Sequence, residues 1–499
     1  MNSIILKLFL FICIFGAILS QHQTEAREKL NVLLITVDDM DWQSPGCYGG
    51  TVNDITPNMD RLASEGMKFM RAHVTVAVCQ PSRQSWLTGK YPHHNGALGF
   101  GPISQKTVTL GELLDKNGYM NGVMCKEHHL APKSKFNWHA IYTSNTMAHG
   151  RSPKLFYKKT KEFIGKAKSQ KKPWFLMISS EDPHRPLHGS PGHKKWATNY
   201  PNIENPSRVY KENEIVVPGF LPDIPEMRTE VARYYSSVKR ADDSVGAVLK
   251  ALKESRQERN TIVILMSDNG MAFVSAKWNT YDQSTRTPLL VRWPGVVKAG
   301  SVDEDHFING TDFMPTILEA LNIKAPRDLD GFSYVPVLKG KKQKGRDHVI
   351  TGHFEAIHYY MNKQKRAAAL AKFAERGWSY DDSKKGMTKE IHMRCVRYPD
   401  ISYVYNEWSD GKDYFYLGGG GTAMMKVAKK NPDIAKRIQH IKHRTPEELF
   451  DCNKDPDELN NLVNNPEYKE KLESMRQKLL HWMKKTKDPI LKTYKSQIQ

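Results

Sequence analysis

Residues 31–39 read NVLLITVDD and set the expected fold. The run at residues 32–37 is apolar at nearly every position, which is typical of a parallel strand buried on both faces. Two carboxylates follow this run at once. Short apolar runs of the same kind recur at residues 174–178, 262–266 and 289–291. We expect all four runs to be buried parallel strands of one sheet.

Helical patterns lie between these runs. The ranges are residues 56–65, with Pro57 at a helix-start position, and residues 108–114, 230–252 and 312–321. Alternation of strands and helices predicts an α/β fold, a mostly parallel sheet with helices on both faces. We expect this main domain to span residues 28–365.

The composition of the sequence changes after about residue 340, where lysines, glycines and aromatic residues become more frequent. Residues 395–406 alternate as an antiparallel strand does, and a glycine run at residues 418–421 indicates a loop. An apolar stripe at helical spacing predicts a packed helix; its members are Leu472, Met475, Leu479 and Trp482. We therefore expect a smaller C-terminal α+β subdomain over residues 366–499.

The first twenty residues have the pattern of a signal peptide. Lys7 precedes an apolar run at residues 8–19, which is too short to span a bilayer comfortably, and small residues lie near its end at Gly16, Ala17 and Ser20. The alternative is an N-terminal membrane anchor. We expect removal of residues 1–20, a secreted or periplasmic protein, and no stable membrane insertion.

The chain of 499 residues carries a formal net charge of +20. Such a charge on a secreted protein suits a polyanionic partner. The sequence shows no zinc-finger spacing and no nucleic-acid recognition motif, so a sulfated oligosaccharide or polysaccharide is the expected partner and nucleic acid is not. A solvated, lysine-rich surface is the alternative explanation of the charge.

Polar residues that could carry chemistry follow the apolar runs. In open α/β sheets, ligands bind at the carboxyl ends of the strands, so these side chains should meet at one edge. They are Asp38, Asp39, Lys126, His128, His184, Asp268 and Asn269. Three carboxylates brought together repel one another, and oxygen ligands of this kind select Ca²⁺ or Mg²⁺. Turns and helix caps are the alternative explanation of the acidic pairs.

The most specific signal is CQPSR at residues 79–83, followed by QSWLTG at residues 84–89. Pro81 suits the first turn of a helix, which places Cys79 at a helix N-terminus, where partial positive charge favours anions. Cys79 is one of five cysteines that remain after signal removal, an odd number that leaves at least one unpaired. An inert buried thiol and a thiol nucleophile are the alternatives for Cys79 alone.

The pentapeptide and the residues around it resemble the type I sulfatases. The C-x-P-S-R signal is similar to the one that a formylglycine-generating maturation enzyme reads when it converts cysteine to formylglycine (3-oxoalanine). The resemblance also implies an alkaline-phosphatase-like fold and one Ca²⁺ held by Asp38, Asp39, Cys79, Asp268 and Asn269. It implies catalytic roles for Cys79, Arg83, Lys126, His128, His184 and Lys277.

The implied roles divide the work among these residues. Calcium and the two lysines would neutralise the sulfuryl oxygens, Arg83 would hold the hydrated aldehyde, and His184 or His128 would move a proton. One departure from the family pattern is Cys125, which stands where the Gly-Lys-x-His element has glycine.

Several further features bear on the substrate. Residues 267–288 look most similar to the heparan N-sulfatase (sulfamidase-like) branch, whose bacterial members include ulvan-active enzymes. The expected substrate is therefore ulvan, another algal oligosaccharide, or a heparan-type glycosaminoglycan. Arg185 and Arg286 are candidate substrate-binding residues, with surface salt bridges as the alternative. The sugar, the sulfate position, the O- or N-linkage and the oligomeric state stay open.

Two other functions remain alternatives at this stage. A phosphomonoester or phosphonate hydrolase of the same superfamily has related metal ligands, although the C-x-P-S-R signal argues against it. A non-enzymatic polysaccharide-binding protein, in which Cys79 is never converted, is the second.

Overall fold

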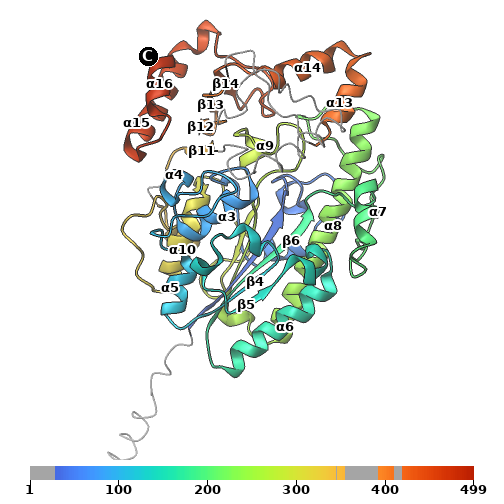
Figure 1. The fold of residues 1–499 in the computed structure, drawn as a ribbon, viewed down its shortest axis with the longest axis vertical. Coiled ribbons are helices and arrows are strands. Elements are labelled where there is room, and N and C mark those ends of the chain that lie inside the picture. The colour runs from blue at the N-terminus through green and yellow to red at the C-terminus, as the bar shows by residue number, and fades with distance from the viewer. Residues whose placement is uncertain (1–28, 344–345, 355–390, 410–418, 499) are drawn as a thin grey trace, which may run out of the picture.

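The computed structural model describes residues 29–343, 346–354, 391–409 and 419–498. A larger part is built on an eight-stranded sheet, and a smaller C-terminal part is built on a four-stranded sheet. Figure 1 shows the smaller part, in orange and red, above the larger one. The expected signal peptide and the expected domain boundary after residue 365 lie outside the described residues.

The large sheet has the strand order β5-β4-β6-β1-β7-β8-β2-β9. Its strands are β1 (Asn31–Asp38), β2 (Met67–Phe69), β4 (Met120–Met124), β5 (Ala140–Tyr142), β6 (Trp174–Pro183), β7 (Thr261–Ser267), β8 (Leu289–Arg292) and β9 (Ser301–Asp303). β1 lies in the middle, parallel to β6 on one side and β7 on the other. The runs at residues 32–37, 174–178 and 262–266 are therefore confirmed as buried parallel strands.

The fourth run forms a strand but in the opposite direction. β8 pairs antiparallel with both β7 and β2, so the prediction of a parallel strand at residues 289–291 is wrong. The chain leaves β7 at the carboxyl edge and stays there through α9 (Asp282–Thr285) before β8 begins. β8 therefore starts at that edge and runs away from it. A short apolar run does not encode this direction.

The alternation of side chains along β1 explains the two-sided core. Leu33, Ile35 and Val37 belong to one hydrophobic cluster. Val32 and Leu34 belong to another. Successive side chains of a strand point to opposite faces, so each face of the sheet is apolar and needs its own layer of helices.

Those two helical layers are present. The first face packs against α2 (Pro57–Ser64), α6 (Pro153–Ser169) and α8 (Pro225–Glu254). The second packs against α3 (Cys79–Thr88), α5 (Leu110–Lys116) and α10 (Phe313–Ala320). Figure 1 shows α3 and α10 to the left of the large sheet and α8 to its right. The four predicted helical ranges correspond to α2, α5, α8 and α10.

Short elements connect this framework. The helices are η1 (Gly46–Tyr48), α4 (Pro92–Asn95), η2 (Glu127–His129), η3 (Lys133–Phe136), η4 (Ser144–Gly150), α7 (Pro191–Ala197), η5 (Glu258–Asn260), η6 (Gly310–Asp312) and α11 (Val335–Leu338). β3 (Ala72–His73) and β10 (Ile308–Asn309) form a two-stranded parallel pair. Within the described ranges, no helix combines the length and the apolar character that crossing a membrane requires.

The C-terminal sheet is antiparallel throughout its four strands. They are β11 (Val349–His353), β12 (Met393–Arg397), β13 (Ile401–Asn406) and β14 (Glu447–Asp451). The single strand predicted at residues 395–406 is in fact the hairpin of β12 and β13. Pro399 and Asp400 lie in the turn, where proline and aspartate are favoured because of their restricted backbone and side-chain hydrogen bonding.

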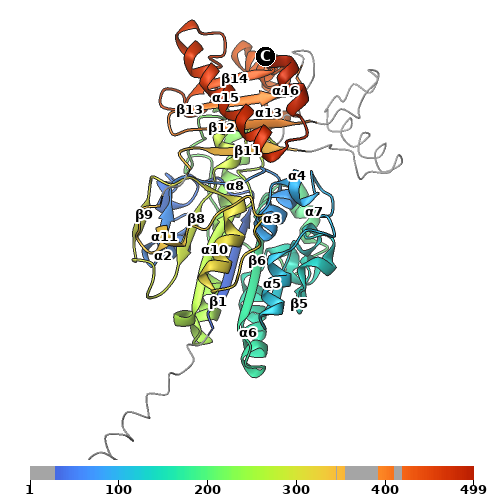
Figure 2. The same ribbon diagram turned by 90° about the vertical axis from the view of Figure 1, so that its left-hand side faces the viewer.

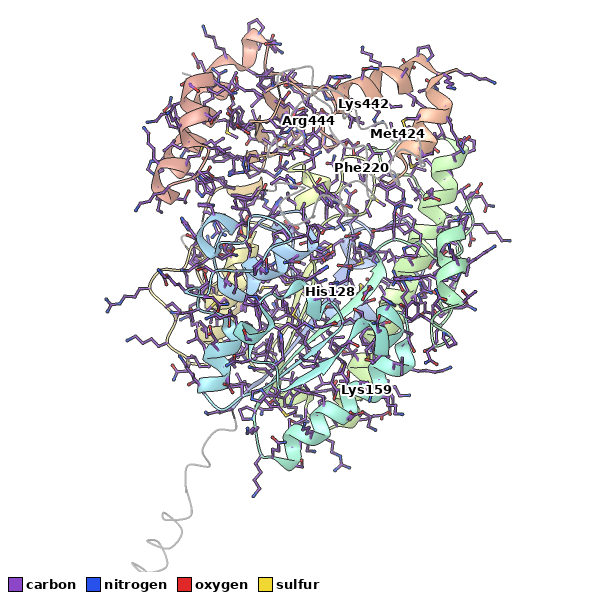
Figure 3. The ribbon with its side chains drawn as sticks, in the orientation of Figure 1. His128, Lys159, Phe220, Met424, Lys442 and Arg444 are labelled. Carbon is purple, nitrogen blue, oxygen red and sulfur yellow. The ribbon has the colours of Figure 1, made fainter. Side chains whose placement is uncertain are left out.

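Helices complete the C-terminal part. They are α13 (Gly421–Ala428), α14 (Pro432–Lys442), η7 (Pro466–Tyr468), α15 (Lys469–Thr486) and α16 (Leu491–Ile498). The predicted stripe on α15 is confirmed as core packing, because Leu472, Met475, Leu479 and Trp482 are buried with residues of the C-terminal sheet. Met424 of α13, labelled in Figure 3, is buried in the cluster that contains α8. The two parts of the molecule thus share a core.

Candidate active site

The carboxyl ends of four parallel strands place the predicted residues at one edge of the large sheet. Asp38 is the last residue of β1, and Lys126, His184 and Asp268 follow β4, β6 and β7. In Figures 1 and 2, β1 runs upward, so this edge faces the C-terminal part. The site therefore lies between the main sheet and the C-terminal sheet.

Cys79 is the first residue of α3, as predicted from Pro81. The preceding residue, Val78, has extended backbone, and all ten residues of α3 are buried. A helix inside the protein holds its first residue firmly, and its free N–H groups create positive potential around the Cys79 side chain.

The cysteine lies within a compact acidic cluster. Single ligand atoms of Asp38, Asp39, Cys79 and Asp268 all lie within 4.8 Å of one another, and all four residues are buried. Asn269 joins the cluster by donating from Nδ2 to Asp39 Oδ1 at 2.7 Å. The five predicted metal ligands are therefore brought together from three segments of the chain.

Two lysines contact this cluster. Lys277 Nζ lies 2.5 Å from Asp39 Oδ1 and 3.2 Å from Cys79 Sγ. Lys126 Nζ lies 2.5 Å from Asp38 Oδ2. Burial alone would lower the pKa of each lysine, but the nearby carboxylates outweigh it and raise both pKa values. Both lysines are therefore charged at neutral pH.

Arg83 contacts two carboxylates of the cluster. Its Nη2 lies 3.0 Å from Asp38 Oδ1 and 2.9 Å from Asp268 Oδ2. Its Nη1 donates to Thr36 Oγ1 at 3.0 Å and to Ser179 Oγ at 2.9 Å. The fully buried guanidinium thus orients two of the acidic side chains. The expected contact with residue 79 is not found among the hydrogen bonds of Arg83 in the described structure.

Burial and neighbouring charges shift the pKa values of Asp38 and Asp268. Burial alone would raise the pKa of Asp38, but Lys126, Asp268, His184 and Arg83 outweigh it and hold that pKa well below its usual value. Burial and the charge of Asp38 raise the pKa of Asp268 to about 8. The two neighbouring carboxyl groups therefore have pKa values shifted in opposite directions, as expected where two acidic groups share one buried site.

The oxygen atoms of the cluster fit a metal ion. Three cationic side chains already balance three carboxylates, so charge alone does not require a metal. Asp39 Oδ2 and Asn269 Oδ1 are nevertheless buried and accept no hydrogen bond within the described residues. Buried polar atoms of this kind are normally satisfied, and a hard cation is the partner that carboxylate and amide oxygens would share.

His184 presents one nitrogen to the cluster. Its Nδ1 lies 2.6 Å from the carbonyl oxygen of Arg185 and so carries the proton, which leaves Nε2, 3.8 Å from Asp39 Oδ2, with its lone pair. Burial lowers the pKa of His184, aided by the charges of Lys126 and Lys277. The geometry therefore suits a proton acceptor.

His128 lies differently. It is exposed in η2 and packs edge-to-face against His129, with ring centroids 4.4 Å apart (Figure 3). Partial burial and the charge of Lys126 lower the pKa of His128. No hydrogen bond to the acidic cluster is found for His128 in the part of the chain that the structure describes.

The two candidate arginines are engaged with protein groups. Arg185 forms an ion pair with Glu230 at 2.7 Å, and its Nε donates to the carbonyl oxygen of Ala272. Arg286 donates to the carbonyl oxygen of Met70 and stacks on the Trp42 ring, 3.5 Å from the centroid. The contacts of Arg286 are those of a structural residue, so its predicted role in substrate binding gains no support.

The backbone is strained where the lysine element begins. Cys125 and Lys126 have φ values of 60° and 53°, and Asp39 has a φ of 63°. This left-handed region favours glycine, which explains why the Gly-Lys-x-His element has glycine where this chain has Cys125. The cysteine adopts the glycine-like conformation, and the two side chains that follow keep their places.

Some site residues have only a weak signal in the sequence. Thr36 and Ser179, the hydroxyl partners of Arg83, occur inside and just after apolar runs. A hydroxyl in an otherwise apolar buried strand is the signal that could identify them. Glu181, buried 3.8 Å from Arg151 in the irregular end of β6, has no such pattern around it.

Comparison with known families agrees with this site. The sulfatase family model matches residues 30–323. A second model, N-sulphoglucosamine sulphohydrolase, C-terminal, matches residues 273–374. The first match contains every residue of the cluster described above.

Two curated proteins are similar over nearly the whole chain. Human N-sulphoglucosamine sulphohydrolase is 28% identical over 485 residues, which covers 92% of this chain and 91% of that protein. An ulvan-active sulfatase from Formosa agariphila is 28% identical over 467 residues, covering 92% of this chain and 80% of that protein. These relatives confirm the predicted likeness to the sulfamidase-like branch.

A solved structure confirms the predicted fold class. The structure of a protein in complex with its substrate D-glucosamine-2-N,6-O-disulfate superposes with a TM-score of 0.64 at 20% identity, covering 92% of this chain and 99% of that one. With a family model that spans more than half of the sequence, the chain belongs to the sulfatase family of hydrolases.

Proposed function

We propose that this protein is a secreted, calcium-dependent sulfatase that removes sulfate from a sulfated carbohydrate. The observation that carries the proposal is the position of Cys79. Its Sγ lies at the start of a buried helix, 3.2 Å from Lys277 Nζ and within the Asp38, Asp39 and Asp268 cluster. That position is where a nucleophile, a cation site and a charged lysine meet.

The nucleophile is formylglycine, formed from Cys79 by a maturation enzyme. The Sγ atom marks where the aldehyde oxygen of the converted residue would lie, beside Asp39 and Lys277. When present, the hydrated aldehyde supplies a hydroxyl nucleophile and a route for release of sulfate. Unconverted Cys79 is poorly suited to attack, because burial and the charge of Asp38 raise the pKa of its thiol.

The cation is Ca²⁺, held by Asp38, Asp39, Asp268, Asn269 and residue 79. Carboxylate and amide oxygens are the hard ligands that Ca²⁺ takes in proteins. When bound, the ion supplies Lewis-acid polarisation of sulfuryl oxygens. The unpartnered Asp39 Oδ2 and Asn269 Oδ1 support this assignment.

The chain's own residues then divide the remaining work. Lys126 and Lys277 stay charged and stabilise the negative charge that spreads over the sulfuryl oxygens. His184 accepts a proton at Nε2. His128, exposed in η2 two residues after Lys126, is the remaining candidate for donating a proton to the leaving oxygen. Arg83 holds Asp38 and Asp268 in place.

The substrate is a sulfated sugar of the glycosaminoglycan or ulvan type. The similar human protein is named for sulphoglucosamine, and the similar bacterial protein is named for ulvan. A formal net charge of +20 suits either polyanion. We further propose that the enzyme acts at chain ends.

Sulfate release across a panel of defined sulfated oligosaccharides, with N- and O-sulfates at known positions, tests the proposal. Phosphate monoesters serve as the rival substrates, and a Cys79→Ala variant serves as the control for adventitious activity. Release from at least one sugar by the wild type, and none by Cys79→Ala, is expected. Faster turnover of phosphate monoesters would favour the phosphohydrolase alternative. Binding without turnover would favour the polysaccharide-binding one.

A further inference from the structure

A row of aromatic side chains includes Trp278, which follows Lys277 in the sequence. Phe100 lies 5.9 Å from Trp278 and 6.1 Å from His129 between ring centroids, and Trp278 lies 6.2 Å from His353. We call these four residues the aromatic rim. They come from the loop after α4, from η2, from the segment after β7 and from β11.

The rim is joined directly to the residues around Cys79. Trp278 follows Lys277, whose Nζ contacts Cys79 Sγ, and the Trp278 backbone N–H donates to the carbonyl oxygen of Ala77 at 3.1 Å. On the other side, Gln80 Nε2 donates to the carbonyl oxygen of Gly101, next to Phe100, at 2.8 Å. Hydrogen bonds to Ala77 and Gln80 thus tie the segments that carry Trp278 and Phe100 to the residues on either side of Cys79.

The rim also leaves apolar surface open. Phe100 is 38% exposed, Trp278 is half-buried, and His353, whose ring lies against that of Trp278, is buried. An open apolar surface next to a charged cluster is the usual composition of a ligand site, where a few polar groups fix orientation and apolar groups supply contact area.

The backbone of Trp278 is strained. Its φ is 64°, in the left-handed region, which is rare and unfavourable for a bulky aromatic residue. Such strain persists only where the surroundings fix it, and it concentrates at functional sites. At this position the left-handed backbone accompanies the contact between Trp278 and Phe100.

We propose that Phe100 and Trp278 form a stacking platform for the sugar ring that carries the sulfate. This inference rests on the proposed function. The charged half of the site takes the sulfate group, and a pyranose ring has an apolar face of C–H groups that suits the aromatic half. A sulfated sugar thus matches both halves at once, whereas inorganic sulfate matches the charged half alone.

Kinetics of a Phe100→Ala variant test the platform. KM for the preferred sulfated sugar should rise about tenfold, the loss expected for one aromatic contact and its buried area. The inhibition constant of inorganic sulfate should change by less than about twofold. Trp278→Phe should keep most of the affinity that Trp278→Ala loses. Phe332→Ala is the matched control, because Phe332 is also 38% exposed but lies against Arg346.

The possible outcomes distinguish failure of the aromatic platform from failure of the proposed sulfatase function. An unchanged KM in Phe100→Ala, or an equal rise in KM and in the sulfate inhibition constant, would overturn the platform while the sulfatase function stands. Failure of the wild type to release sulfate from any sugar would overturn the proposed function, and the platform with it. Because Phe100 is exposed, its variant should fold, which circular dichroism checks.

Discussion

At the scale of single residues, the site combines a helix start with several left-handed positions. Cys79 opens α3, while Asp39, Cys125, Lys126 and Trp278 have positive φ values. Each of these conformations costs free energy that the surrounding packing must supply. These four positions lie at the carboxyl edge of the sheet, where the functional side chains need fixed directions.

Position 79 should carry formylglycine in protein made by a host with the maturation enzyme. The motif at residues 79–83 and the location of Cys79 Sγ beside Lys277 motivate this prediction. Mass spectrometry of the peptide that contains residue 79 should show the aldehyde or its hydrate. Fully active enzyme with only unmodified cysteine at this position would contradict it.

Cys125 offers a test of backbone strain. Cys125→Gly should retain activity and change the free energy of unfolding by no more than about 1 kcal/mol, because relief of strain offsets the loss of a buried side chain. Cys125→Val should lose about 2 kcal/mol or more, because a β-branched residue is strongly disfavoured at a φ of 60°. Urea unfolding of both variants gives these free energies. Equal stability of the two variants would show that φ does not limit this position.

The metal site makes a further prediction at this scale. Asp268→Asn should abolish tight Ca²⁺ binding and lower kcat by about three powers of ten, since a metal ion stabilises transition-state charge by several kcal/mol. Calorimetric titration with Ca²⁺ and sulfate release measure the two effects. Asp242→Asn is the control, because Asp242 is buried but bonds to the backbone of Asn58 and Met59 on α2. Full activity after complete removal of metal would refute the assignment.

At the scale of elements, the sequence predicts whatever depends on local pattern. The apolar runs of β1, β6 and β7 and the helices α2, α5, α8 and α10 are visible because their patterns are strong. The direction of β8 and the split of residues 393–406 into β12 and β13 are less visible, since both depend on how the chain returns after an element. Pro399 and Asp400 are the one local signal for that hairpin turn.

Within the site too, the sequence identifies residues that belong to a motif but not the contacts that depend on tertiary packing. The residues that end strands or open α3 could be found from the sequence. The partners Thr36 and Ser179, the contacts of Arg83 with carboxylates and the engagement of Arg286 with Trp42 depend on tertiary packing. No spacing in the sequence encodes these contacts, and the hydroxyls of Thr36 and Ser179 in or beside apolar runs are only a weak signal for two of the residues.

A buried ion pair fixes the C-terminal helices to their sheet. Arg394 of β12 bonds to Asp488, which follows α15, with Nε 2.7 Å from Oδ2, and both side chains are fully buried. Asp488→Asn should lower the free energy of unfolding by about 3 kcal/mol at pH 7, because it leaves a buried arginine uncompensated. Asp400→Asn is the control, since its pair with Lys471 is exposed and should be worth less than about 1 kcal/mol.

The difference in free energy of unfolding between the wild type and Asp488→Asn should depend on pH. Burial alone would raise the pKa of Asp488, but Arg394 and two hydrogen bonds outweigh it and lower that pKa. The stabilisation is therefore present above the ordinary aspartate pKa of about 3.9 and is lost as the pH falls through the lower, folded value. Urea unfolding of wild type and Asp488→Asn between pH 7 and 3 should show the gap narrowing at the acidic end. A gap that widens there would contradict the assignment.

At the scale of the whole molecule, the C-terminal sheet faces the edge where the catalytic strands end (Figures 1 and 2). His353 of β11 packs against Trp278, and Tyr281 donates to Glu448 of β14 at 3.0 Å. The second part of the chain thus closes one side of the site. An edge closed in this way favours the end of a sugar chain over its middle.

The last prediction concerns chain ends and charge. We expect desulfation of short sulfated oligosaccharides to be faster, per sulfate group, than desulfation of the intact polymer from which they are cut. A site closed by the C-terminal sheet admits a terminal sugar, and the polymer has few ends.

The rate should also fall as salt rises toward 0.15 M, where the screening length is about 8 Å, because a formal net charge of +20 attracts the polyanion. Sulfate release at matched sulfate concentration, with product analysis by mass spectrometry, measures both effects. Equal rates on internal and terminal sugars would show that the site is an open groove, and a rate that is insensitive to salt would show that the charge does not steer the substrate.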